Sequence, residues 1–386
     1  MLGVLSPSLS IANGGVYAPD SLSEIHASGR DPKEAVLWRG IDAMYSYRFQ
    51  EAESALDSAV TLDPDNVVAP FVAIANKWLL MLAEQGFEAS HKALLEAINA
   101  TIPEYEAMIS RSGRRAEVLL FLGSTYGFRT RLYLADKRWL AGLYSGLKGW
   151  NQVRQAYAMD STLADAYFPI GIFDYYSGMH SAPVQLAARI FGIRPDRRLG
   201  IQILQAAVRE APYAWIEAAS TLAIIYLYIE NDPELAYRYS ELLMQHYPDN
   251  YYFNSLMGEA LVRTGRLAEA RAFMPPSKAR IMRSHPHQRH EWLLKYAFLE
   301  AAVAFEQGDL ETALERCEWV INNYEMEFDW HLGFAHYMRA QIREARGDYA
   351  GSRKDYRAVV GLDNRTYVVE EARQALRRLA RIKEEG

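Results

Sequence analysis

The sequence predicts an all-α fold: a right-handed superhelical solenoid of helix–turn–helix repeats. Two observations predict it. Small residues followed by a helix-stopping proline recur in the same order along the chain, and no segment of useful length alternates between apolar and polar residues as a strand would. With 386 residues, of which 50% are hydrophobic, the chain has enough apolar surface to bury a continuous core.

The clearest repeat unit lies between residues 34 and 66. Gly40 sits inside its first helix, Ala52 follows twelve residues later in the second helix, and Pro64 ends the unit. Small residues allow antiparallel helices to cross closely, and proline stops a helix because it lacks an N–H. The same order returns, in whole or in part, at Gly200, Leu204, Ala207 and Pro212; at Ala236, Ser240, Leu243 and Pro248; at Gly258, Gly265 and Ala270; at Gly308 and Ala313; and at Ala340, Gly347 and Tyr349.

These residues resemble the tetratricopeptide repeat, a helix–turn–helix unit of about 34 residues. The resemblance is weak between residues 66 and 160. There, Gly142, Gly146 and Gly149 recur at helical spacing and predict that two helices pack closely. In that region we expect long helices over 67–85, 90–110, 115–135 and 138–159.

The segment 165–210 breaks the simple repeat with one inserted, proline-started helix near 183–191. It resembles a eukaryotic family of tetratricopeptide-repeat proteins, the inclusion-body-clearance and tetratricopeptide-repeat 39-like family. Ile201 departs from the leucine usual in that family, and the order at Phe191-Gly192 also differs. The resemblance implies a non-enzymatic adaptor near lipid or a membrane surface. It is carried by Gly171, Phe173, Pro183, Phe191-Gly192, Asp196-Arg197 and Gly200.

Residues 1–30 differ in composition from the rest of the chain. They have no Lys or Arg before Arg30, and the run Val16-Tyr17-Ala18 resembles a signal-peptidase site. We expect either a degraded signal peptide or a disordered tail. The first implies a bacterial exported or periplasmic protein whose start is truncated, and the second a cytoplasmic one. The solenoid is expected over residues 31–386, with 366–386 as its C-terminal capping helix.

Composition excludes several classes of function. The chain has 42 Lys and Arg against 48 Asp and Glu, and this net charge of −6 argues against a nucleic-acid partner. The single cysteine, Cys317, excludes an internal disulfide and a cysteine-based zinc or iron–sulfur site; its position predicts a buried, inert thiol. The longest clean apolar stretch, 218–229, is shorter than the roughly 20 residues of a membrane span.

Three histidines are the sharpest candidates for chemistry. His285, His287 and His290 have spacing that allows a shared metal ion if the segment is a turn entering a helix. The alternative is a solvated loop between Pro275 and Pro286, whose several cations disfavour a metal ion. No nucleotide-binding or hydrolase motif occurs in the sequence. We therefore expect no cofactor and no enzymatic activity.

The expected partner site is an aromatic-rich concave groove formed by the first helix of each repeat. Such a wall suits a peptide or partner helix with apolar anchors, and Arg263 is placed to fix a carboxylate. The alternative is that individual residues of this set belong to the core. The candidates are Tyr175, Tyr176, Tyr228, Tyr252, Glu259, Arg263, Tyr337 and Gln341.

The last helix is amphipathic, with Ala375, Leu376, Leu379 and Ile382 on one side. Its opposite face is basic and predicts either a solvated cap or contact with an anionic membrane or acidic partner. That face contains Arg373, Arg377, Arg378, Arg381 and Lys383. Together these features favour a non-catalytic protein-interaction scaffold. A membrane-surface adaptor is the alternative, and a metal-binding protein is the remote one.

Overall fold

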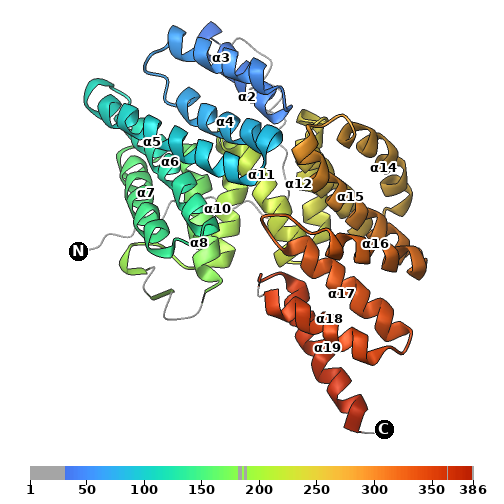
Figure 1. The fold of residues 1–386 in the computed structure, drawn as a ribbon. Coiled ribbons are helices and arrows are strands. Elements are labelled where there is room, and N and C mark those ends of the chain that lie inside the picture. Colours follow the sequence, from blue (N-terminus) through green and yellow to red (C-terminus); the bar gives the residue numbers. More distant parts are fainter. Residues whose placement is uncertain (1–30, 181–184, 187–188, 363, 385–386) are drawn as a thin grey trace.

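The computed structural model describes residues 31–180, 185–186, 189–362 and 364–384, and within them the chain is helical, without strands. Successive helices form antiparallel pairs that stack into a solenoid, which confirms the predicted all-α repeat fold (Figure 1). The elements are α2 (Pro32–Tyr45), α3 (Phe49–Leu62), α4 (Ala69–Gln85), α5 (Phe87–Arg111), α6 (Arg115–Ala135), α7 (Trp139–Met159), η1 (Ala164–Ala166), α8 (Tyr167–Gly178), α10 (Arg197–Glu210), α11 (Trp215–Ile224), η2 (Ile225–Ile229), α12 (Pro233–His246), α13 (Tyr251–Arg263), α14 (Leu267–Ile281), α15 (Pro286–Glu306), α16 (Leu310–Asn322), α17 (Trp330–Ala345), α18 (Tyr349–Leu362) and α19 (Tyr367–Glu384).

Two predicted segments fall outside this description. The leader, residues 1–30, is not described, and neither are residues 181–184 and 187–188 of the predicted inserted helix. The helix that follows, α10, begins where the sequence predicts, because the Asp196 carboxylate accepts the Leu199 N–H at 3.0 Å.

The small residues of the repeat lie where paired helices cross. A Cβ added to Gly40 of α2 would lie 2.9 Å from the Leu56 side chain of α3. One added to Gly200 of α10 would lie 2.5 Å from the backbone nitrogen of Tyr175 in α8. No side chain fits at such separations, so glycine sets the distance between the two helices of a pair.

Most turns within a pair contain one residue in the left-handed region. Gly265, Gly308 and Gly347 have φ of 74°, 76° and 82°. Glycine adopts this conformation without steric cost, which is why it marks the turns in the sequence. Tyr47 and Lys137 adopt the same left-handed conformation, with φ of 59° and 57°. Their turns contain no glycine at this position, so the glycine pattern of the sequence does not predict them.

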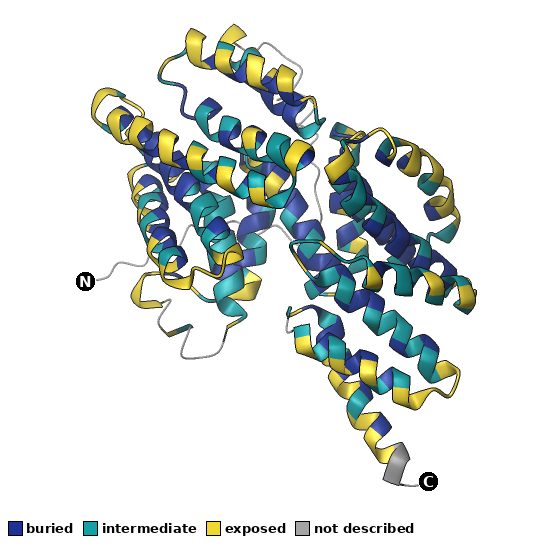
Figure 2. Ribbon diagram, in the orientation of Figure 1, coloured by how far each residue is buried: buried dark blue, intermediate teal, exposed yellow. Residues whose placement is uncertain are grey.

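The four long helices predicted between residues 66 and 160 are present as α4 to α7. The apolar stretch 218–229 forms α11 and the π-helical segment η2, and nearly all of it is buried in the centre of the molecule (Figure 2). None of the described helices is long and apolar enough to cross a membrane.

The prediction of a loop between Pro275 and Pro286 is wrong. Helix α14 continues through Pro275 and Pro276 to Ile281, and α15 begins directly at Pro286. Pro275 and Pro276 have no N–H to donate to the carbonyls of Arg271 and Ala272. Arg271 and Ala272 are exposed, so water replaces the missing donors.

The solenoid curves until its first helices meet its later ones. Helix α4 packs against α15 (Figure 1), and Tyr45, the last residue of α2, lies beside Asn250, the residue before α13. The Tyr45 hydroxyl donates to Glu217 at 2.6 Å, and Asn250 donates to the Tyr45 carbonyl at 2.7 Å. Tyr247 donates to Asp42 at 2.9 Å. These contacts close the concave side of the solenoid around a shared core.

Candidate functional site

The predicted groove residues Tyr228 and Glu259 meet in a buried polar cluster with His331. Tyr228 Oη donates to Glu259 Oε1 at 3.0 Å, and His331 Nε2 lies 2.8 Å from the same oxygen. Burial, followed by the negative charge of Glu259, raises the pKa of Tyr228 well above its usual value, so its hydroxyl stays protonated. Glu259 is 4% exposed and His331 5%, so this cluster holds η2, α13 and α17 together.

Arg263, predicted to fix a partner's carboxylate, already has neutral partners within the chain. Its guanidinium lies over the Tyr367 ring, 4.8 Å from the centroid, and donates to the Tyr367 hydroxyl. It also donates to Asn231 Oδ1 at 2.5 Å. The side chain thereby ties α13 to α19 and to the turn after η2.

The remaining predicted groove residues each have neighbours within the chain. Tyr175 is buried and donates to Glu230 at 2.7 Å, and the Tyr176 ring meets the Tyr175 ring edge-on at 5.1 Å. Tyr252 is half-buried beneath the Lys295 ammonium, which lies 4.4 Å from its ring centroid. Farther along, Tyr337 packs on Tyr356, and Gln341 is half-buried.

The sequence reasoning missed the residues that close the concave side. Tyr45, Asn250 and Tyr247 join segments about 200 positions apart, as their hydrogen bonds show. The only signal was the high tyrosine content, 25 residues, because a buried phenol packs as an apolar ring and still supplies a donor. From the sequence alone, the aromatic residues of the first helices are interpreted as the lining of a partner-binding groove.

The three candidate histidines point to different neighbours. The His285 ring packs on Phe49, and His290 Nε2 lies 3.1 Å from the Asn323 carbonyl. His287 lies beside Gly86. In the part of the chain that the structure describes, no group of three or more His, Cys, Asp or Glu side chains converges to hold a metal ion.

Two other predicted groups have structural surroundings. Cys317 is fully buried, and burial raises the pKa of its thiol to about 12, so the reactive thiolate is absent at neutral pH. In α19, Ala375 and Leu379 are buried, while two arginines of the basic face pair with acids: Arg377 with Glu370 at 3.0 Å and Arg378 with Glu344 at 2.7 Å.

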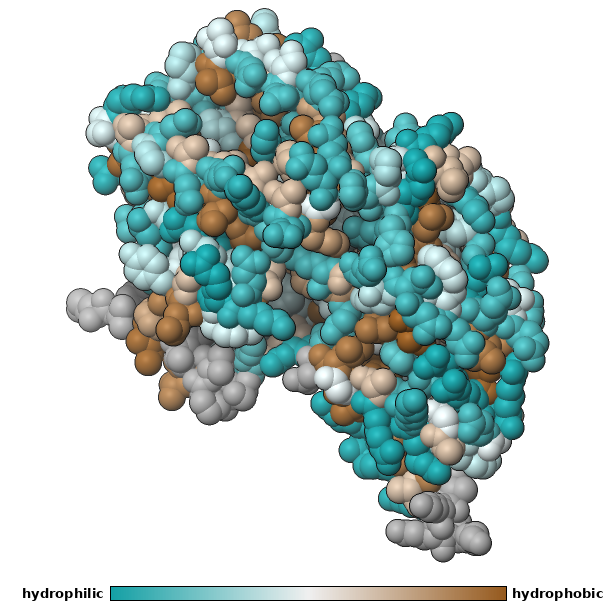
Figure 3. All heavy atoms as spheres, in the orientation of Figure 1, coloured by the Kyte–Doolittle hydropathy of each residue, from teal (hydrophilic) through white to brown (hydrophobic). Residues whose placement is uncertain are grey.

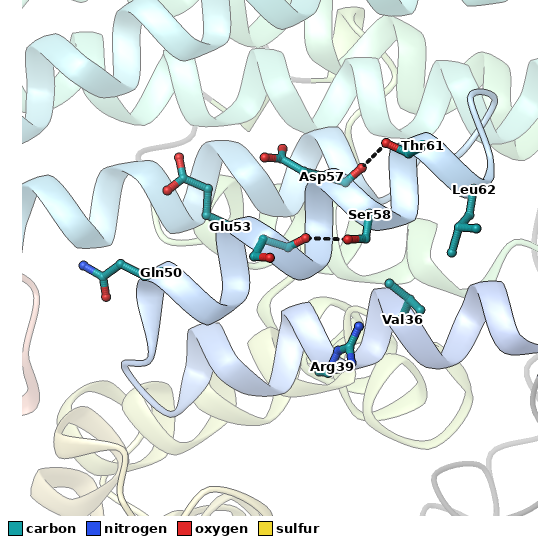
Figure 4. A pocket seen from close by; sticks show the side chains of 9 residues that line it. Val36, Arg39, Gln50, Glu53, Asp57, Ser58, Thr61 and Leu62 are labelled. Carbon is teal, nitrogen blue, oxygen red and sulfur yellow. Dashed lines mark hydrogen bonds between the residues drawn. The ribbon is translucent and has the colours of Figure 1, made fainter.

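The open hollows of the surface lie on the outer side of the first repeats. One, of about 800 Å³, lies between α3, α4 and α5, with Ile74, Leu80 and Met108 among its lining residues. A second, of about 720 Å³, lies along α2 and α3. Glu53 and Asp57 border both, and Figure 4 shows their carboxylates on the edge of α3 that faces away from α2.

Comparison with known proteins gives structural similarity alone. No family model and no curated protein matches the chain. A tetratricopeptide repeat protein from Parabacteroides merdae is 11% identical, over 90% of this chain and 98% of that one, with a TM-score of 0.31. The P58(IPK) TPR domain is 16% identical over 92% and 100%, with a TM-score of 0.28.

A third similar structure is the APC/C hetero-tetramer Cut9–Hcn1. It is 10% identical, covers 92% of this chain and 91% of that one, and has a TM-score of 0.21. These scores are low, and the repeat architecture is established by the chain's own helix pairs. The chain is a tetratricopeptide-like solenoid.

Proposed function

We propose that the chain is a non-catalytic scaffold that binds a segment of a partner protein. The observation that carries this proposal is the open hollow between α3, α4 and α5, which combines an apolar floor with an acidic edge. The concave groove expected from the sequence is a weaker candidate, because Tyr175, Tyr228 and Glu259 are buried. The likeness of residues 165–210 to adaptor proteins supports the same class of function.

The chemistry of the hollow suggests the class of partner. Val60, Leu80 and Pro103, which are exposed or half-buried, offer apolar contacts to a helix or extended peptide with aliphatic anchors. Glu53 and Asp57 lie one helical turn apart on α3 and favour a basic residue of the peptide at that edge, while Lys77 and Arg111 also line the hollow. The net charge of −6 supports a protein partner over nucleic acid.

The test is quantitative capture of partners from source-cell lysate by the wild type and by charge variants. The hollow variant carries Glu53→Lys and Asp57→Lys. The control carries Glu311→Lys and Glu315→Lys on α16, which have the same spacing and side chains 83% and 72% exposed. We expect a partner that the wild type and control retain and the hollow variant loses by at least tenfold. Equal retention by all three would contradict the proposed site.

A third variant tests the concave groove separately. Tyr176→Ala with Gln341→Ala removes two predicted groove side chains that are half-buried. Loss of the partner in this variant, with retention by the hollow variant, would return the binding site to the concave side. Amide hydrogen exchange on the captured complex would then show protection in α8 and α17 rather than in α3 and α5.

A further inference from the structure

The first half of α7 presents large apolar side chains to solvent. Leu140 is 85% exposed, Tyr144 69%, Trp139 65% and Leu143 58%. In Figure 3, brown spheres gather at the lower left edge of the molecule, where Figure 1 places α7 and the segment after α8. Contiguous apolar surface of this kind marks an interaction site, since a soluble chain rarely leaves it uncovered.

The exposure follows from how α7 packs. Its inward face is the stripe Gly142, Gly146 and Gly149, and a Cβ added to Gly149 would lie 2.8 Å from the Gly123 carbonyl oxygen in α6. The first half of the helix therefore buries its glycines and directs its large residues outward, whereas Trp150 and Val153 in the second half are buried. Packing against the residues that the structure describes does not account for the outer side chains.

The segment before α10 extends this surface. The Phe191 carbonyl accepts hydrogen bonds from Trp150 Nε1 at 2.9 Å and from Arg154 at 3.0 Å, which fixes it against α7. Ile190 is 79% exposed and Phe191 43%. Trp150 and Arg154 follow Leu143 on the same face of the helix at seven- and eleven-residue spacing, so the two apolar groups belong to one side of the molecule.

The charge of this region is opposite to that of the chain. Residues 136–160 and 174–196 contain six Lys and Arg against four Asp and no Glu, whereas the whole chain has 42 Lys and Arg against 48 Asp and Glu. Lys137, Arg138 and Arg189 are exposed beside the apolar side chains. The nearest acid before α7, Asp136, is engaged with His91 at 3.2 Å. Cationic side chains beside exposed apolar ones favour a binding partner with an anionic surface.

We propose that Trp139, Leu140, Leu143, Tyr144 and the neighbouring Ile190 and Phe191 form a peripheral docking surface for an anionic lipid bilayer. Leu140 is 85% exposed and Ile190 79%, so both side chains are free to enter the fluid interface of a bilayer. Trp139 and Tyr144 suit the headgroup level, where amphipathic rings are favoured. The arginines and Lys137 face lipid phosphates.

The test is sedimentation of the full chain with vesicles of phosphatidylcholine, with and without 30 mol% phosphatidylserine (about the anionic content of a cytoplasmic leaflet). We expect at least tenfold stronger partitioning onto the anionic vesicles, weakened as salt rises from about 0.05 to 0.3 M. Leu140→Glu with Leu143→Glu should lose binding by at least tenfold. Lys137→Glu with Arg138→Glu should lose the preference for phosphatidylserine.

Matched controls separate this surface from others. Leu62→Glu with Met282→Glu alters two leucine-sized side chains that are 48% and 51% exposed on other helices, and it should bind like the wild type. Arg377→Glu with Arg381→Glu tests the basic face of α19 and should also bind normally. Circular dichroism melting of each variant verifies that the fold is retained.

Several outcomes would overturn the proposal. One is equal partitioning onto both vesicle types, and another is wild-type binding by the Leu140→Glu, Leu143→Glu variant. A third is that the chain does not bind vesicles but dimerises in a concentration-dependent way that this variant abolishes. That result would assign the exposed surface of α7 to contact with a second copy of the chain. Loss of vesicle binding only in the α19 variant would move the membrane contact to the last helix.

Discussion

Tyr228 and Tyr144 are residues of the same type in opposite surroundings: Tyr228 lies inside the solenoid, and Tyr144 lies on the surface of α7. Tyr228 is 3% exposed, and its hydroxyl donates to Glu259, whereas Tyr144 is 69% exposed. The difference comes from the neighbouring helices: α11 and η2 are covered by α12, α13 and α17, whereas Leu140 and Tyr144 of α7 are left exposed by the described residues. Residue type alone therefore does not separate a core position from a binding surface.

The largest expected effect tests the inner side of this comparison. Glu259→Ala removes the acceptor shared by Tyr228 and His331 and leaves these two buried groups only the longer contact between them, 3.4 Å from Tyr228 Oη to His331 Nε2. We expect the free energy of unfolding to fall by about 3 kcal/mol, because a buried polar group without a partner keeps its full desolvation cost. Denaturant unfolding followed by circular dichroism measures it.

Two companion variants sharpen this result. Glu259→Gln keeps an oxygen that accepts both hydrogen bonds and should cost less than half as much. Glu315→Ala, at a side chain 72% exposed, should change stability by less than about 0.5 kcal/mol. If Glu259→Ala is as mild as Glu315→Ala, the buried cluster does not stabilise the fold.

The fold was predictable because its signals are local. Gly40, Gly200 and Pro64 mark crossings and helix ends within a few residues of the structure they determine, and the same is true of the glycine turns. The turns at Tyr47 and Lys137 carried no such signal. The prediction of a loop at Pro275 is wrong for the converse reason. Proline is a strong local signal for the end of a helix, but α14 continues through it because water satisfies the freed carbonyls at this exposed surface.

The candidate site was less predictable because it depends on distant pairing. The sequence placed Tyr228, Glu259 and Arg263 on first helices, as the structure does, but it did not indicate that Tyr45 and Asn250 would close the solenoid. How tightly the helices curve is set by many small packing angles between neighbouring repeats. The exposure of Leu140 also depends on which face the glycines of α7 turn inward.

The second prediction concerns pH and again compares buried with exposed groups. Burial raises the pKa of Asp174 to about 6 despite the hydrogen bond from the Arg194 N–H at 2.9 Å, and burial likewise raises the pKa of Asp165 to about 6. The folded state therefore binds protons that the unfolded state has released. The contribution of these two carboxyls to stability should be greatest below about pH 4 and be lost as the pH rises through about 6, by about 2 kcal/mol for each carboxyl between pH 4 and pH 6.

Asparagine variants isolate this effect. Asp174→Asn keeps the oxygen that accepts the Arg194 N–H but cannot titrate, so it should remove about half of the loss between pH 4 and pH 6. Asp165→Asn should remove the other half. Urea unfolding at a series of pH values gives both, and an unchanged slope in the double variant would refute the assignment.

The third prediction compares backbone strain at two turns. Lys137 has φ of 57° at the foot of α7, so Lys137→Gly should raise stability by about 0.5–1 kcal/mol through relief of the left-handed conformation. Gly265→Ala should lower it by about 1 kcal/mol, and because no atom lies within 4 Å of the added Cβ, the cost is purely conformational. Thermal melting of both variants measures the pair, and shifts of the same sign would contradict the argument.

The smallest expected effect tests the outer side of the comparison. Leu140→Ser with Tyr144→Ser removes two large side chains that are 85% and 69% exposed, so little apolar area returns to water on unfolding. We expect a change below about 0.5 kcal/mol in the free energy of unfolding. The matched inner variant, Tyr228→Ser, should cost several kcal/mol because it leaves a cavity and removes one of the two hydrogen-bond partners of Glu259. If the α7 variant destabilises the fold as strongly, its side chains pack within the chain itself, and no outside surface is needed to explain them.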